Sequence, residues 1–271
     1  QRPRFSQQAV DLYRWAEGEI KGYAVTVANG RLWILSPRGP MYEMERELFE
    51  KTVGPTQHED DVPKLVPVRI EYSESLAHVP TLLAQVTSNR RLSSSTFKEI
   101  SDDFGLELAI DHILFKAGLQ ERYPHSSEQK RTLYNLLLCL AENELVALVA
   151  RLLEDQGLHL PAPSGGFVRN VDLFAYNDHR LSKRIGRLVV PPREPFRPGA
   201  VAIQVRSESH EISPEVSSEV SYLIQLNAED SEHILSYRWI EWALHYSPRT
   251  KAWLARLSRW VPFSGSVLRR V

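Results

Sequence analysis

The stretch GYAVTVANGRLWILSPRG, residues 22–39, contains two runs rich in β-branched and aromatic residues that flank Asn29 and Gly30. Asn-Gly is the pair that best tolerates the positive φ angles of a type I′ turn, which joins the strands of a two-residue hairpin. The stretch therefore predicts a β-hairpin over residues 23–35. The neighbouring elements expected from periodicity are helices over 5–20 and about 40–52 and a strand over 66–72.

The middle of the chain, residues 76–160, has the apolar periodicity of helices. Leu106, Ala109 and Ile113 recur at a spacing of three or four residues, as on the buried face of a helix. A leucine-rich run beyond residue 130 is expected to break near Glu142 and to end at Gly157. Several short helices in one segment predict a small helical bundle.

The last part of the chain, residues 167–271, mixes expected strands and helices. Strands are predicted over 171–176 and 200–206, and a stiff proline-rich connector lies at 191–199. The pair Ser247-Pro248 predicts the start of a helix, because proline at the first helical position loses no hydrogen bond. We therefore expect an α+β protein with three parts: a unit over 1–75 that contains the hairpin, a helical bundle over 76–160, and a mixed β/α unit over 167–271.

The composition is that of a soluble globular protein. Of the 271 residues, 42% are hydrophobic and 25% are charged, and the formal net charge is −1. These values argue against disorder, collagen-like repetition and a coiled coil for the whole chain. No apolar run approaches the about 20 residues of a membrane-spanning helix, so we expect no integral membrane association. The single cysteine, Cys139, and the absence of an apolar signal-like stretch in the first thirty residues favour the cytoplasm.

Charge is segregated along the chain. The net charge is +4 over residues 167–199, −6 over 200–242 and +6 over 243–271. No acidic residue follows Glu241. Blocks of one sign are typical of solvated faces or interaction surfaces, so the near-zero total does not exclude an anionic partner.

Two basic clusters are the candidate contact sites for a partner or for nucleic acid. Their members, with two tryptophans able to stack on bases, are Arg180, Lys183, Arg184, Arg187, Arg249, Lys251, Trp253, Arg256, Arg259 and Trp260. An amphipathic C-terminal helix could instead bind a partner groove or a membrane surface. The simplest interpretation is a terminal helix whose tryptophans pack into the core while its arginines reach solvent or pair with the acids of 208–232.

An acidic stripe in the predicted bundle is a candidate docking site for a basic partner. Its members recur every four residues: Glu99, Asp103, Glu107 and Asp111. The alternative is a solvated helix face. The residues around Gly105 resemble a helix-turn-helix motif, which would imply DNA binding. Glu107 and Asp111 would then face the phosphates, so a structural or protein-docking helix pair is the favoured interpretation.

Signals of catalysis are few. The sequence has no phosphate-binding glycine loop, no Gly-x-Ser-x-Gly elbow, no paired Cys-x-x-Cys and no His-Glu-x-x-His. We assign no catalytic, cofactor-binding or metal-binding residue. The leading hypothesis is a non-catalytic interaction or regulatory module of a larger cytoplasmic assembly, with another protein as partner. The alternatives are sequence-tolerant nucleic-acid binding through the basic clusters 180–197 and 249–270, and an enzyme whose site assembles from distant residues.

Overall fold

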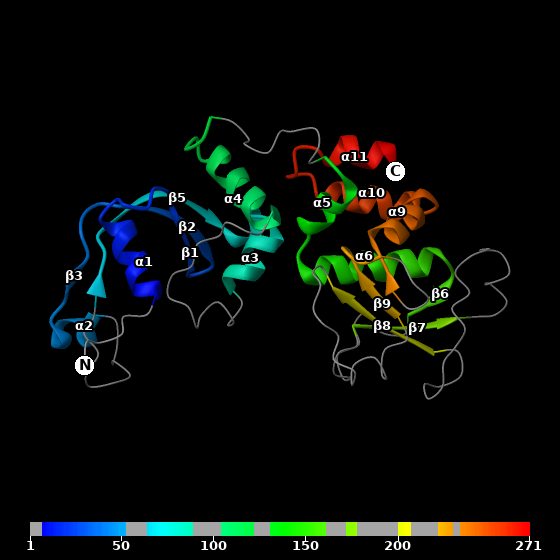
Figure 1. Cartoon of the computed structure of the whole chain (residues 1–271), viewed down its shortest axis with the longest axis horizontal. Helices are drawn as coiled ribbons and strands as arrows, with labels where there is room; N and C mark the ends of the chain where they lie inside the picture. The colour runs from blue at the N-terminus through cyan, green and yellow to red at the C-terminus, as the bar shows by residue number, and fades with distance from the viewer. Residues whose placement is uncertain are drawn as a thin grey trace. The chain divides into compact units, whose positions relative to one another are not determined.

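The structure of the chain is a computed structural model (Figure 1). It describes residues 7–52, 64–88, 104–121, 131–160, 172–177, 200–206, 222–229 and 234–271. These residues form helices and small sheets whose strands pair mainly antiparallel, which confirms the predicted α+β class.

The chain divides into two compact units. The first comprises residues 1–102 and 113–121, and the second comprises 103–112 and 122–271. Helix α4 (Phe104–Lys116) contributes its first half to the second unit and its second half to the first. The three-domain division expected from the sequence stays a prediction.

The predicted hairpin is confirmed. Strands β1 (Ala24–Ala28) and β2 (Arg31–Pro37) pair antiparallel, with Ala28 opposite Arg31. Between them Asn29 and Gly30 adopt φ angles of 54° and 69°, as a type I′ turn requires. The local sequence therefore sets both the turn and the register of this pair.

The hairpin is part of a three-stranded sheet of order β1-β2-β5, in which β5 (Val68–Ser75) pairs antiparallel with β2. Leu32 and Ile34 of β2 are fully buried. Helix α1 (Gln7–Ala16) lies within the predicted range 5–20, and its buried Trp15 donates a hydrogen bond from Nε1 to the carbonyl of Gly22 at 3.1 Å. This bond holds α1 to the start of the hairpin.

The helix expected over 40–52 begins only at Arg46, so its predicted start is wrong. Residues Tyr42–Glu43 form strand β3, which pairs antiparallel with β4 (Lys64–Leu65). Helix α2 spans Arg46–Thr52. Pairing with a distant strand thus overrides the local helical pattern. The first unit also contains a short 3₁₀ helix, η1 (Leu76–His78), and α3 (Thr81–Ser88).

The second unit contains a five-stranded mixed sheet of order β10-β9-β8-β7-β6. Its strands are β6 (Leu158–His159), β7 (Leu173–Asn177), β8 (Ala200–Arg206), β9 (Tyr222–Gln225) and β10 (Ile234–Leu235). Strands β6, β7 and β8 pair antiparallel, whereas β8, β9 and β10 run parallel. The strands predicted near 171–176 and at 200–206 are confirmed. Asp172, just before β7, accepts a hydrogen bond from the backbone N–H of Val205 at 2.7 Å and so ties β7 to β8.

The leucine-rich run forms two helices, α5 (Leu133–Leu138) and α6 (Glu142–Asp155). The predicted break near Glu142 is confirmed, and there the Glu144 carboxylate accepts a hydrogen bond from the N–H of Ala141 at 2.9 Å. After α6 the chain turns at Gly157, whose φ of 87° suits glycine. The helices and their break therefore follow the local sequence.

The core of the second unit joins this helical run to the C-terminal part of the chain. Leu148 and Leu152 of α6 are fully buried in one cluster with Leu173 of β7, Ile224 of β9 and Ile240. Ile240 belongs to α9 (Tyr237–His245), which is followed by α10 (Pro248–Leu257) and α11 (Ser264–Arg270). Helix α6 contacts β6, β7, β8, α9 and α10. Burial of its apolar face thus depends on segments that lie far along the chain.

Replacing Gly30 by alanine is expected to weaken the hairpin by about 1–2 kcal/mol, because an L-residue is strained at a φ of 69°. An added Cβ would meet no atom within 4 Å, so the cost comes from the backbone conformation alone. Hydrogen exchange of the β1 and β2 amides, followed by mass spectrometry, should become faster. The control is Gly39→Ala, whose Cβ would meet Pro67 Cγ at 3.9 Å, an ordinary contact. Equal exchange in both variants would contradict the prediction.

Candidate interaction surface

The C-terminal helix α10 starts where the sequence predicts, with Pro248 at its first position. The backbone N–H of Lys251 donates to the carbonyl of Ser247 at 2.9 Å. The Ser247 side chain, however, makes no capping hydrogen bond, and its buried Oγ finds no partner among the described residues. The helix start therefore rests on proline rather than on a side-chain cap.

Helix α10 is held to α6 by one polar contact and one cation–π contact. Thr250 Oγ1 donates a hydrogen bond to Asp155 Oδ2 at 2.6 Å. The Arg151 guanidinium lies 4.7 Å from the ring centroid of Trp253, within the range of a cation–π interaction. These contacts fix which face of α10 turns toward the core and which faces solvent.

The two tryptophans named as possible stacking residues pack against the core instead. Trp253 and Trp260 are both half-buried, and both lie against the apolar cluster of the second unit. Trp260 also contacts the ring of His112, with centroids 5.9 Å apart. Trp253 has Arg151 over its ring. The geometry thus matches the interpretation in which these tryptophans support the helix.

A buried pair of serines connects α10 to α11. Ser258 Oγ and Ser264 Oγ are 2.6 Å apart, and Ser258 Oγ also donates to the carbonyl of Leu254 at 2.7 Å. Val267 and Leu268 of α11 are buried in the core. The bases at the end of α11 are therefore held by a fixed helix.

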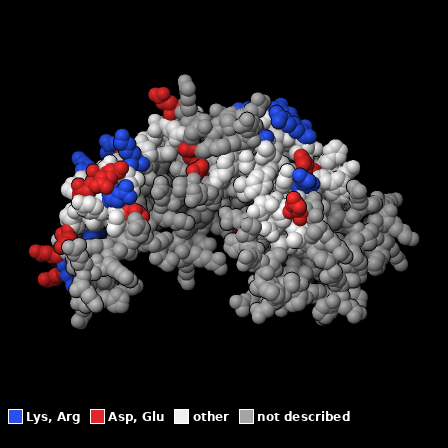
Figure 2. Space-filling model, viewed as in Figure 1, with Lys and Arg blue, Asp and Glu red and all other residues white. Residues whose placement is uncertain are grey.

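Five arginines of this region reach solvent, and we call them the basic surface: Arg249, Arg256, Arg259, Arg269 and Arg270. Within the described part of the chain, none of them lies in an ion pair. Arg249 and Arg256 are seven residues apart on α10, so they share one face and lie about 10 Å apart along the axis. Figure 2 shows Lys and Arg side chains gathered over α11. Lys251 is half-buried and lies beside this surface rather than in it.

An aromatic group lies at the end of α9, and the sequence did not single it out. It consists of Trp242, His245 and Tyr246; the Tyr246 ring centroid lies 5.3 Å from that of Trp242 and 5.0 Å from that of His245. His245 Nδ1 is 3.1 Å from the carbonyl oxygen of Val271, next to Arg270. His245 and Tyr246 follow Trp242 by three and four residues. Residues at this spacing share one face of a helix, so the sequence pattern could have predicted the group.

The other candidate residues divide between described and undescribed parts of the chain. Outside the described residues lie Arg180, Lys183, Arg184 and Arg187, together with Glu99 and Asp103. Glu107 and Asp111 lie one turn apart on α4 and are half-buried. Docking of a basic partner on this stripe stays a prediction. Gly105 is buried in the first turn of α4, and residues 89–103 before this helix lie outside the described residues, so the resemblance to a helix-turn-helix stays a prediction.

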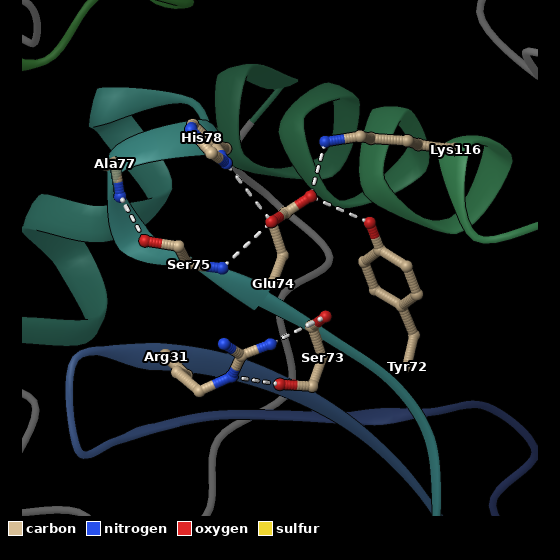
Figure 3. Close-up of polar contacts among 8 residues, drawn as sticks. All are labelled: Arg31, Tyr72, Ser73, Glu74, Ser75, Ala77, His78 and Lys116. Carbon is tan, nitrogen blue, oxygen red and sulfur yellow. Dashed lines mark hydrogen bonds and ion pairs between the residues drawn. The ribbon is translucent and has the colours of Figure 1, made fainter.

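The strongest charge network of the first unit centres on Glu74 of β5 (Figure 3). Its carboxylate accepts hydrogen bonds from Lys116 Nζ at 2.5 Å, Tyr72 Oη at 2.9 Å and the Ser75 N–H at 3.0 Å. His78 Nδ1 lies 3.4 Å from its Oε1. The hydrogen bonds from Lys116 and Tyr72 lower the pKa of Glu74 from 4.5 to about 2.

This network stabilises each of its groups in one protonation state. The hydrogen bond to Glu74 also raises the pKa of Lys116, while burial and the same carboxylate raise the pKa of Tyr72. Each group is thus stabilised in the state it already has at neutral pH. The network joins β5 and η1 to the second half of α4.

Within the described ranges, no group of three or more His, Cys, Asp and Glu side chains is arranged to hold a metal ion. A hollow of about 850 Å³ opens in the second unit at the start of α9, lined by Tyr134, Tyr237, Arg238 and Glu229 among others. Ser236 Oγ accepts a hydrogen bond from the Arg238 N–H at 3.1 Å, so this amide at the start of α9 is not available to a ligand in the hollow.

Cys139, the single cysteine, is buried in the core, and its thiol donates to the Asn135 carbonyl at 3.2 Å. Among the helices that the structure describes, none combines the length and the apolar character needed to span a membrane. Comparison of the chain with protein-family models, with curated proteins and with solved structures finds no match.

Replacing Thr250 by valine is expected to lower the free energy of unfolding by about 1 kcal/mol, because the shape is kept but the hydrogen bond to Asp155 is lost. Urea unfolding at neutral pH measures this loss. The matched control is Thr26→Val at an exposed position of β1. The prediction is wrong if both variants unfold at the same urea concentration as the wild type.

Replacing Glu74 by glutamine is expected to make the first unit less stable near neutral pH, with a loss that shrinks in acid. The pKa of Glu74 is lowered by folding, so its contribution is present above pH 4.5 and is lost as the pH falls toward about 2. Hydrogen exchange of the β5 amides across this range, compared between wild type and variant, measures the effect. The control is Glu43→Gln on exposed β3. A wild-type-to-variant difference that stays constant with pH would rule out this role for Glu74.

Proposed function

We propose that this chain is a non-catalytic interaction module of a larger cytoplasmic assembly, and that its basic surface binds an acidic surface of another protein. The observation that carries the proposal is the set of five exposed arginines on α10, α11 and the turn between them, without an ion pair in the described part of the chain. Unpaired guanidinium groups on a rigid support are suited to bind carboxylates through bidentate hydrogen bonds.

The rigidity of the support favours a binding surface over a flexible tail. Helix α10 is fixed by Thr250 and Arg151, and α11 is fixed by the serine pair and by buried Val267 and Leu268. The backbone of these helices needs no ordering on binding, so the entropic cost is limited to that of ordering the arginine side chains.

Two features favour a protein over a nucleic acid as the partner. Single-stranded nucleic acids are bound by exposed aromatic rings on which bases stack, yet Trp253 and Trp260 pack against the core. In addition, Glu241 is exposed on α9, one turn before His245. A flexible acidic segment of a protein can be placed away from this one carboxylate, whereas a regularly charged phosphate backbone cannot.

The polar contacts with the best geometry have structural roles, which supports a non-catalytic module. Glu74, Asp155 and Asp172 each accept hydrogen bonds that join two elements of the fold. The enzyme hypothesis, with a site assembled from distant residues, stays a prediction.

Reversing three charges of the basic surface tests the proposal. The triple variant Arg249→Glu, Arg256→Glu and Arg259→Glu should bind a fluorescein-labelled peptide of glutamate and aspartate about tenfold more weakly than the wild type in an anisotropy titration at low salt. Added salt should weaken wild-type binding, because these charges are exposed. The matched control has the same charge change on exposed bases of the first unit, Lys21→Glu, Arg38→Glu and Lys51→Glu, and should bind like the wild type.

Two outcomes would overturn the proposal. In one, the triple variant binds the acidic peptide as well as the control variant does. In the other, a labelled single-stranded or double-stranded oligonucleotide of equal charge binds the wild type far more tightly than the peptide does, which would favour the nucleic-acid alternative.

A further inference from the structure

Tyr246 is the most exposed of the large aromatic side chains at the C-terminal end of the described chain, at 65% of its maximum. It belongs to the aromatic group, and its ring packs edge-on against His245 and tilted against Trp242. Trp242 in turn packs against the core. The group is therefore a supported apolar surface that reaches solvent, rather than a single loose side chain.

The aromatic group is continuous with the basic surface. The contact between His245 Nδ1 and the Val271 carbonyl, at 3.1 Å, brings the end of α9 to the end of α11, where Arg269 and Arg270 are exposed. On the other side, Arg249 follows Tyr246 three residues later in the first turn of α10. Exposed arginines thus lie near the aromatic group at the end of α11 and in the first turn of α10.

We infer that the aromatic group binds an apolar side chain within an acidic segment of a partner protein, while the flanking arginines bind the carboxylates of that segment. The inference rests on the proposed function and adds to it the chemistry of the partner. Tyrosine, tryptophan and arginine are the residue types found most often among the side chains that dominate the binding energy of protein interfaces. The positive charge of the arginines favours a partner segment in which acidic residues surround the apolar side chain.

Other anionic partners fit this surface less well. The exposed carboxylate of Glu241 lies one turn before His245 on the same helix, close to where a phosphate backbone or an anionic lipid surface would have to lie. A flexible acidic peptide can avoid the one carboxylate, whereas a dense phosphate array cannot.

A pair of labelled peptides tests the inference. Both consist of glutamate and aspartate, and they differ only in a central phenylalanine or serine. The wild type is expected to bind the phenylalanine peptide about five- to tenfold more tightly than the serine peptide. Tyr246→Ala should remove this preference but keep the salt-dependent binding of both peptides. The matched control is Tyr13→Ala on α1 of the first unit, where the tyrosine is 46% exposed.

The outcomes separate the inference from the proposed function. If the wild type binds both peptides equally, or if Tyr246→Ala keeps the preference for phenylalanine, the inference is overturned while the basic surface remains a binding site. If neither peptide binds, or if the triple arginine variant binds both normally, the proposed function fails as well. Tighter binding to phosphatidylserine vesicles than to either peptide, lost in Tyr246→Ala, would replace the protein partner by a lipid surface. Circular dichroism of Tyr246→Ala identical to that of the wild type excludes misfolding as the cause.

Discussion

The burial of α6 against the mixed sheet and against α9 and α10 is the constraint on which the second unit depends. Leu148 and Leu152 are fully excluded from water, and they meet residues from β7, β9 and α9 in one cluster. An interior of this kind has no place for an unpaired charge, because desolvating an ion costs far more than a packed leucine contributes. The charged side chains of the C-terminal helices are therefore confined to the outer faces.

This constraint converts a charge pattern along the chain into a charge pattern in space. Leu254 of α10 is buried, whereas Arg249 and Arg256 of the same helix are exposed on one face. No acid follows Glu241, so the C-terminal segment offers the arginines no neighbour of opposite sign. The basic surface results from these two facts together: the core excludes charged side chains, and all charged residues of the C-terminal segment are basic.

The aromatic residues of the same region have different roles because their contacts differ. Trp253 and Trp260 lie against the core, and each has a further neighbour, Arg151 or His112, over or beside its ring. Tyr246 stands at the end of α9, where it is 65% exposed and contacts the rings of Trp242 and His245. Aromatic side chains of the same region thus differ in role: the two tryptophans that lie against the core support the fold, whereas Tyr246 is exposed to solvent.

Structural elements that depend only on neighbouring residues could be predicted from the sequence. Asn29 and Gly30 specify a turn whatever surrounds them, and Pro248 begins a helix because its ring already has the required φ. Features with distant causes could not be predicted in this way. The helix expected from residue 40 begins at Arg46 because Tyr42 pairs with Leu65 of a distant strand. The sequence shows that every charged residue after residue 243 is basic. It does not show which of these residues are exposed or form ion pairs, because that depends on how the chain packs. Only the tertiary structure decided that the two tryptophans lie against the core, that five arginines and Tyr246 are exposed, and that the ends of α9 and α11 meet. These outcomes depend on which distant segments of the chain pack together and bury their apolar side chains.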